Sequence, residues 1–448
     1  MMQQPPPPSL LPPPPSDLSS YCFASPSTRI RHIIAVSSCK GGVGKSTISA
    51  NLAFSLSSGS EEGPRVGVLD ADVFGPSLPL LVAPDADLVT FVGRQIRPLE
   101  RGGLPPARRP VKLQSFGYVN EGAATMRGPM VNQLLKQFLD LTAWGELEYL
   151  VVDLPPGTGD VQLTLCQELR FRMAVVVATP SRLAWEDVRK GIDMFEGVGV
   201  PCRAVVENMA FVQEDDTNWG EWGDGGEVLD EELRGRVLRE WGEGGGDEAV
   251  AGRVLDLAGE LLRDRSEAAP PRPSPFGLPG QNSAELAEKY GIDATFSLPI
   301  YKPLADSADT GTPFVLSHPE SAAAAVFRDL ADTVEEEAER LRTEGVKGEL
   351  TLSAGAAGSD VRVSDAAGSE LGVLPARELR LACGCASCKE EFTGRKLLDE
   401  GAVPEDVRPQ SLRREGNYAV QVVWDDGHRS LYPYGQIREL LEEAARQT

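Results

Sequence analysis

The chain has 448 residues, a formal net charge of −23 and 41% hydrophobic residues. That length gives room for about two or three domains, each with its own core. The negative charge argues against a general nucleic-acid surface or an anionic membrane as a partner. No apolar run approaches the length of a membrane span, so we expect no membrane insertion. The cysteines are too few and too unevenly spaced for a disulfide scaffold, which indicates a reducing compartment; they are Cys22, Cys39, Cys166, Cys202, Cys383, Cys385 and Cys388.

Residues 1–28 form a leader rich in proline and serine, including the run QQPPPPSLLPPPPSDLSS. Such a composition cannot bury a core, so the sequence predicts disorder here. The leader has no arginine before Arg29 and no charged-then-apolar pattern, which makes it a poor organelle transit peptide and a poor secretory signal. The residues alone leave the compartment open, and cytoplasm and mitochondrion both remain alternatives.

The stretch from His32 to Thr47, HIIAVSSCKGGVGKST, has the pattern of a phosphate-binding loop. An apolar run at 33–36 suits a buried strand, a glycine-rich loop follows, and helical periodicity begins at Ser46. In such a loop the backbone N–H groups and the helix N-terminus face the phosphates. Lys45 neutralises charge near the β- and γ-phosphate oxygens, and Ser46 can ligate Mg²⁺. The sequence therefore predicts a nucleoside triphosphate site.

Apolar strands alternate with helical stretches downstream, which predicts the α/β fold class with a doubly wound parallel sheet. We expect strands at 65–69, 148–153, 173–178 and 202–207, and helices at 126–141 and 181–195. Active groups in such sheets gather at the carboxyl ends of the strands. Asp72 follows one strand, where it can position water or a metal ion, and Asp153 ends another as the expected Mg²⁺ partner. The loop LPPGTGD at 154–160 is placed to sense the γ-phosphate.

The remainder of this phosphate-loop domain, taken as 29–345, includes an expected strand pair at 85–120 and an acidic insertion at about 212–275. The insertion has two stretches with an apolar helical face and the tryptophans Trp219, Trp222 and Trp241. This pattern predicts a helical hairpin packed on the domain, and a docking site for a partner is the alternative. A long helix over 320–342 is the expected last element.

A second, mostly-β domain is expected at 348–444, after a stretch rich in glycine, alanine and serine. It contains Cys383, Cys385 and Cys388, and His428 follows in WDDGHRSLYP. Clustered thiolates suit a soft metal, and the histidine offers a fourth ligand. The residues thus predict a metal site and leave the metal open.

Four motifs resemble those of the Mrp family of deviant P-loop ATPases, the iron–sulfur cluster carriers, and are similar to its plastid high-chlorophyll-fluorescence branch: SSCKGGVGKST, DADVFGPSLP, DLPPGTGDVQLTLCQ and VVENMA. The resemblance implies slow ATP hydrolysis used as a conformational switch in a homodimer, delivery of a [4Fe–4S] cluster to apoproteins, and a plastid location. It also implies three roles. Lys40 is similar to the lysine that reaches the partner's phosphates, Asp72 to the residue that orients water, and Asn208 to the residue that reads adenine.

The expected catalytic residues are thus Lys40, Lys45 and Asp72. The expected nucleotide-binding residues are Lys40, Gly41, Gly42, Val43, Gly44, Lys45, Ser46, Thr47, Asp153 and Asn208.

The sequence departs from the family pattern at the cluster site. Carriers usually have a Cys-x-x-Cys pair shortly after the ENM segment, whereas this chain has no cysteine between Cys202 and Cys383. The cluster ligands therefore stay unassigned. Cys39, beside the phosphate loop, is a candidate for a cluster or redox role, and Cys166 and Cys202 are expected to be small buried hydrophobes. The assembly-type domain that precedes the ATPase in this branch is expected to be absent or truncated.

The second domain resembles the N-terminal domain of γ-butyrobetaine hydroxylase, in which a Cys-x-Cys-x-x-Cys motif and a distant histidine hold zinc. The resemblance makes Zn²⁺ the leading assignment for Cys383, Cys385, Cys388 and His428, and an iron–sulfur ligand set is the alternative because both use thiolates. Two other functions stay open at this point. One is a positioning ATPase of the ParA/MinD type without a cluster, although the acidic-leaning tail QIRELLEEAARQT counts against membrane positioning. The other is an adaptor in which the zinc domain docks a client and the ATPase gates it.

Overall fold

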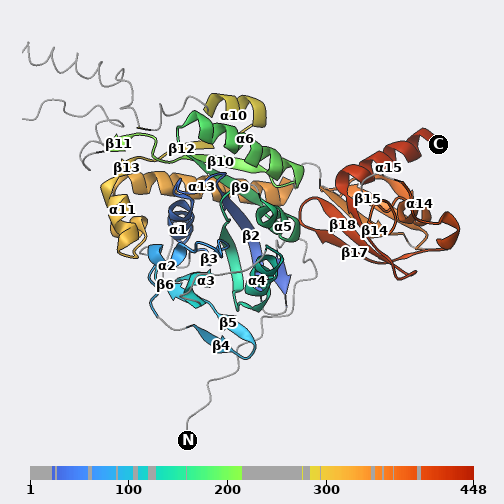
Figure 1. Cartoon of the computed structure of the whole chain (residues 1–448), viewed down its shortest axis with the longest axis horizontal. Helices are drawn as coiled ribbons and strands as arrows, with labels where there is room; N and C mark the ends of the chain where they lie inside the picture. The colour runs from blue at the N-terminus through green and yellow to red at the C-terminus, as the bar shows by residue number, and fades with distance from the viewer. Residues whose placement is uncertain are drawn as a thin grey trace, which may run out of the picture.

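The computed structural model describes residues 23–25, 28–58, 63–86, 89–103, 109–119, 128–157, 159–213, 275, 283–292, 294–344, 349–355, 358–366, 368–390 and 395–447. These residues form a layered α/β unit followed by a smaller, mostly-β module, which we call the C-terminal module (residues 349–447) (Figure 1). The expected boundary between the two, at 345–348, lies outside the described residues. Within the described part of the chain, no helix is both long and apolar enough to cross a membrane.

A central sheet organises the α/β unit. In spatial order its strands are β12 (Ala294–Ser297), β10 (Cys202–Glu207), β9 (Met173–Ala178), β2 (Thr28–Ser37), β8 (Gly145–Asp153), β3 (Val66–Asp70), β7 (Val111–Ser115) and β6 (Leu99–Arg101). Neighbours pair in parallel except at β6, which runs antiparallel to β7. This is the expected doubly wound parallel sheet, so the predicted fold class is confirmed.

Strand residues alternate between two apolar layers, because successive side chains of a strand point to opposite faces. Ile34 and Val36 of β2 belong to one buried cluster, and Ile33 and Ala35 belong to the other. The first layer is completed by α1 (Lys45–Leu56), α2 (Leu78–Leu81), α11 (Lys302–Asp309), α12 (Phe314–Ser317) and α13 (Ala322–Glu344). The second is completed by α4 (Gly128–Leu141), α5 (Asp160–Glu168), α6 (Arg182–Gly197) and α10 (Ser283–Tyr290).

Two predictions for the first part of the chain are corrected. The leader was expected to be disordered over 1–28, but Phe23–Ser25 form β1, which pairs antiparallel with the start of β2 at Thr28–Ile30. The apolar side chains at both places allow this short hairpin to extend the sheet. The strand pair expected at 85–120 is instead four strands and a helical turn: β4 (Thr90–Val92), β5 (Gln95–Arg97), β6, β7 and α3 (Phe116–Val119).

The acidic insertion can be placed only by its ends. At its first two residues, β11 (Val212–Gln213) pairs in parallel with β13 (Ile300–Tyr301). Apart from 212–213 and 275, the segment predicted as a tryptophan-containing helical hairpin lies outside the described residues.

The C-terminal module consists of two three-stranded antiparallel sheets around a core of its own. The first sheet contains β14 (Leu350–Ala354), β15 (Asp360–Asp365) and β16 (Glu370–Pro375), and the second contains β17 (Pro409–Glu415), β18 (Ala419–Trp424) and β19 (Arg429–Pro433). The helices are α14 (Ala376–Leu381), α15 (Tyr434–Gln447) and the 3-10 turn Glu400–Ala402. Trp424, Tyr432 and Ile437 are fully buried in the core.

Candidate functional site: a nucleotide cavity and a Cys3His cluster

The phosphate loop borders a cavity of about 330 Å³ at the carboxyl ends of the central strands. The loop follows β2, and the helix after it, α1, begins at Lys45. Helices α2 and α11 close the opposite side, a contribution that the sequence analysis missed. The lining residues are Ser38, Lys40, Gly41, Gly42, Gly44, Lys45, Ser46, Thr47, Asp72, Ser77, Leu80, Leu81, Pro156, Ala308 and Asp309.

Asp153 and Lys45 form the buried charged pair of this site. They are 2% and 6% exposed, and Lys45 Nζ donates to Asp153 Oδ1 at 2.5 Å. Ser49 Oγ donates to the same oxygen at 2.8 Å, whereas Asp153 Oδ2 has no hydrogen-bond partner. A buried carboxylate oxygen without a partner is costly unless a ligand occupies it. Oδ2 is therefore available to a cation or its bound water.

Asp70 holds the loop that carries Asp72, a function that sequence reasoning did not assign to it. Its Oδ1 accepts from the backbone N–H of Asp72 at 3.0 Å. Its Oδ2 accepts from the backbone N–H groups of Ser77 and Leu78 and from Ser115 Oγ, all within 3.0–3.2 Å. Burial and the nearby Asp153 raise the pKa of Asp70 to about 7. Asp72 itself lines the cavity, with Oδ1 accepting from the Gly75 N–H at 3.1 Å.

Asn208 contacts the phosphate loop but does not line the cavity. It follows β10, is 5% exposed, and its Nδ2 donates to the Val43 carbonyl oxygen at 2.8 Å. Gly44 has φ +87°, and a Cβ there would overlap the Asn208 amide nitrogen, so this position requires glycine. Asn208 Oδ1 is buried without a partner. Its position next to the loop suits the predicted role in base recognition, which stays a prediction.

Lys40 lines the cavity but is held within its own chain. Its Nζ lies 3.1 Å from Asp187 Oδ2 of α6. The neighbouring Cys39 is half-buried against Gly191 of the same helix, where an added Cβ would collide with the Cys39 sulfur. Burial raises the pKa of Cys39 to about 11, so its thiol is protonated near neutral pH.

Cys166 of α5 and Cys202 at the start of β10 are buried in the second apolar layer. Burial raises the pKa of Cys166 to about 12 and also raises that of Cys202. Both are small apolar core residues, which confirms the interpretation of these two positions.

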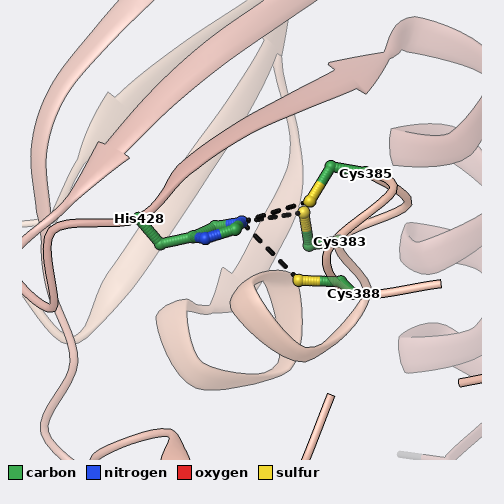
Figure 2. Close-up of side chains that lie close together, drawn as sticks. All are labelled: Cys383, Cys385, Cys388 and His428. Atoms are coloured by element: carbon green, nitrogen blue, oxygen red, sulfur yellow. Dashed lines mark hydrogen bonds between the residues drawn. The ribbon is translucent and has the colours of Figure 1, made fainter. Parts of the chain in front are cut away.

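Cys383, Cys385, Cys388 and His428 converge in the C-terminal module, as the sequence predicted. Figure 2 shows the imidazole pointing at the three sulfur atoms. His428 Nε2 lies 3.4, 3.5 and 3.6 Å from the sulfurs of Cys383, Cys385 and Cys388, and all four ligand atoms lie within 4.8 Å of one another. Metal–sulfur and metal–nitrogen bonds of about 2.3 and 2.0 Å at tetrahedral angles give a sulfur–nitrogen separation of about 3.6 Å. The set therefore fits one tetrahedral ion.

A buried arginine lies beside the cluster and links it to Asp426. Arg380, 5% exposed, points Nη1 at Cys388 Sγ at 3.7 Å and donates from Nε to Asp426 Oδ2 at 2.9 Å. Asp426 Oδ1 in turn accepts from the His428 backbone N–H at 2.8 Å. Such outer contacts orient metal ligands and offset their charge. Within the described residues, no other group of three or more cysteine, histidine or acidic ligands comes together in this way.

Two family models match the chain. Residues 29–224 match the model described as an NUBPL iron-transfer P-loop NTPase, and residues 355–438 match the N-terminal model of γ-butyrobetaine hydroxylase-like proteins.

Individual proteins extend these matches. The chloroplastic Fe-S cluster assembly factor HCF101 of Arabidopsis thaliana is 38% identical over 416 residues, which are 92% of this chain and 65% of that protein. The iron-sulfur cluster carrier protein of Pseudomonas fragi is 35% identical over 309 residues, 68% of this chain and 85% of that protein. Among solved structures, a nucleotide-binding protein from Archaeoglobus fulgidus in complex with ADP is 29% identical, covering 64% of this chain and 88% of that one with a TM-score of 0.43.

The chain spans 65% of the length of the Arabidopsis thaliana protein. For this reason the activity of that whole protein is not assigned to this chain. The Pseudomonas fragi protein is matched over most of its length, and the iron-transfer family model covers the phosphate-loop region. The nucleotide cavity and the expected motifs lie in that same region. The chain therefore belongs to the iron–sulfur cluster carrier family of P-loop NTPases.

Proposed function

We propose that this protein is an ATP-hydrolysing carrier that delivers [4Fe–4S] clusters to apoproteins. The observation that carries the proposal is the cavity lined by the phosphate loop and Lys45, with Asp153 bonded to Lys45 behind it, in a chain of the carrier family. A phosphate loop with a buried strand-terminal carboxylate is the arrangement that binds Mg²⁺ and a nucleoside triphosphate.

In this proposal Ser46 and Asp153 hold Mg²⁺, which neutralises phosphate charge, while Lys45 contacts the β- and γ-phosphate oxygens. Asp72 orients the attacking water, and Asp70 fixes the loop that carries it. Lys45 already donates to Asp153, so Lys45 would give up this contact to reach the phosphates, and Asp153 would be free to hold Mg²⁺.

The working state is a homodimer in which Lys40 of each subunit contacts the partner's phosphates. That role requires Lys40 to leave Asp187, and the cost is modest because ion pairs near the solvent are weak. Hydrolysis reopens the dimer, so the ATPase acts as a switch and turns over slowly.

The Cys3His cluster binds a structural Zn²⁺ and is separate from the transported cluster. A [4Fe–4S] cluster needs ligands spread around a body of four iron atoms, whereas these four ligand atoms surround the volume of one ion. The transported cluster then uses other cysteines, and Cys39 is the candidate nearest the nucleotide. The plant relatives are named as chloroplastic, which supports a plastid location.

Anaerobic reconstitution with iron and sulfide tests the proposal on the full chain and on a full-length triple variant, Cys383→Ser with Cys385→Ser and Cys388→Ser. We expect zinc in the wild type, no zinc in the triple variant, and a visible-absorbing cluster in both. A cluster that disappears with the triple variant would move the cluster site to the C-terminal module. Zinc without any cluster in the wild type would contradict the carrier function and support the adaptor.

A second measurement tests the ATPase. ATP hydrolysis should be detectable in the wild type with Mg²⁺ and should be lost in Lys45→Ala. The matched control is Lys190→Ala, which removes an exposed cation of α6 that pairs only with Asp187 among the contacts described. Equal activity in all three proteins would show that the phosphate loop is not the active site.

A further inference from the structure

The C-terminal module rests on the end of α5 through the turn between β17 and β18 (Figure 1). Gly416 in this turn has φ +52°, and a Cβ there would lie 2.9 Å from the Cys166 carbonyl oxygen and closer still to that of Gln167. Both carbonyls belong to the last turn of α5. Only glycine allows the two backbones to approach this closely.

The next residue, Asn417, donates hydrogen bonds to two segments of the α/β unit. It is 7% exposed, and its Nδ2 donates to the Phe171 carbonyl oxygen at 2.5 Å and to the Gly199 carbonyl oxygen at 3.1 Å. Phe171 lies just before β9, and Gly199 lies between α6 and β10. One side-chain amide thus satisfies two backbone acceptors that lie far from it in sequence.

A buried ion cluster adds a second point of attachment. Glu349, 7% exposed, accepts from Arg170 Nη2 at 2.6 Å and also from Arg414 of β17. Arg170 belongs to the segment between α5 and β9, so the α/β unit supplies one cation and the C-terminal module supplies the other. Glu349 is thus the shared partner of both arginines, and removing its carboxylate would leave two guanidinium groups at the contact without it.

The opposite end of α5 is tied to the phosphate loop. In the segment that leads into the helix, the backbone N–H of Leu154 donates to the Val36 carbonyl at 3.0 Å. Gly157 N–H likewise donates to the Ser38 carbonyl at 2.9 Å. Gln162, in the first turn of α5, donates from Nε2 to Ser37 Oγ at 2.5 Å. Helix α5 has nine residues and is about 13 Å long. One short rigid helix therefore joins the nucleotide cavity to the module.

We propose that docking of the C-terminal module on the end of α5 strengthens nucleotide binding, and that nucleotide in turn strengthens docking. This inference rests on the nucleotide chemistry of the proposed function. A docked module fixes the end of α5 and so orders the segment 154–157, which contacts the phosphate loop, before the phosphates arrive. When the module undocks, the end of α5 is released. Nucleotide binding must then order the segment before α5 at a cost in free energy, so the affinity for nucleotide is lower. Coupling of this kind is reciprocal by linkage.

The test uses the full chain and three variants. Gly416→Ala places a methyl group against the α5 carbonyls, and Asn417→Ala removes both donated hydrogen bonds. The matched control is Gly368→Ala: Gly368 also has a positive φ, +85°, but a Cβ there meets nothing within 4 Å. Each protein is checked for bound zinc, and amide hydrogen exchange of β17 and β18 reports docking with and without ATP and Mg²⁺.

We expect both interface variants to keep their zinc, to exchange faster in β17 and β18, and to bind ATP about fivefold more weakly or worse, with the control unchanged. Unchanged ATP affinity in variants whose hairpin exchanges faster would overturn the coupling. Unchanged exchange in both interface variants would overturn the docking contact itself. The assay involves no iron–sulfur cluster, so failure of the carrier proposal leaves its outcome readable.

Discussion

Gly44→Ala is the substitution for which the structure predicts the most specific effect. Its backbone has φ +87°, and its Cβ would overlap the Asn208 amide nitrogen, the group that donates to the Val43 carbonyl. Gly42, two residues earlier in the same loop, has φ +78°, but a Cβ there meets nothing within 4 Å. The two glycines therefore carry similar backbone strain, and only one of them contacts Asn208.

The magnitudes follow from that difference. Placing a side chain in the left-handed region costs about 1–2 kcal/mol, and both variants bear this cost. Displacing Asn208 also leaves a buried amide or carbonyl unpaired, which costs about 1–3 kcal/mol more. Gly44→Ala should then lower the free energy of unfolding by about 2–5 kcal/mol, and Gly42→Ala by about 1–2 kcal/mol.

Urea unfolding without nucleotide measures these free energies, and a double-mutant cycle isolates the contact. In an Asn208→Ala background no amide remains to be displaced, so Gly44→Ala should cost only the strain that Gly42→Ala costs. If Gly44→Ala and Gly42→Ala are equally destabilising, or if Asn208→Ala gives no relief, the packing of Asn208 against the loop is wrong.

Three further predictions concern other parts of the chain. Burial lowers the pKa of His32 to about 3 in the folded protein, whereas the histidine of the unfolded chain has a pKa near 6.5. Between pH 6.5 and about 3 only the unfolded chain binds the proton, so the free energy of unfolding should fall by about 1.4 kcal/mol for each pH unit in that range. His32→Leu should flatten this slope in urea unfolding, and an unchanged slope would refute the assignment. Lys45→Met leaves Asp153 buried without its cation and should cost about 3 kcal/mol of stability in the same urea assay, and a loss below about 1 kcal/mol would refute the buried ion pair. Arg380→Met should weaken zinc retention against a competing chelator about 10-fold or more, because it removes the cation beside Cys388; equal retention would show that this contact does not tune the site.

The nucleotide cavity was predictable because parallel register brings the ends of strands together. Val36 of β2 pairs with Asp153 of β8, which pairs with Asp70 of β3, so three strand ends far apart in sequence meet at one edge. The apolar runs predicted those strands and the glycine-rich loop predicted the phosphates. The Cys3His set was predictable from the spacing of its cysteines, because thiols this close together in sequence rarely serve as ordinary core residues.

What sequence reasoning missed depends on contacts that no local pattern encodes. Asp70 and Asp72 look equivalent in the sequence, and only the folded loop shows that Asp70 binds its backbone while Asp72 faces the cavity. The pairing of Lys40 with Asp187 likewise depends on where α6 packs. Asn417 reaches Phe171 across 246 positions of sequence, and a polar residue in a turn carries no signal of such a partner.

The attachment of the C-terminal module has a consequence for where a second subunit approaches. Asn417 binds segments that lead into β9 and β10, at the amino ends of the central strands, while the nucleotide cavity opens at their carboxyl ends. The two surfaces lie at opposite ends of the strands of one sheet. If the homodimer proposed above closes over the phosphates, the second subunit therefore approaches the end of the strands opposite to the segments that hold the C-terminal module.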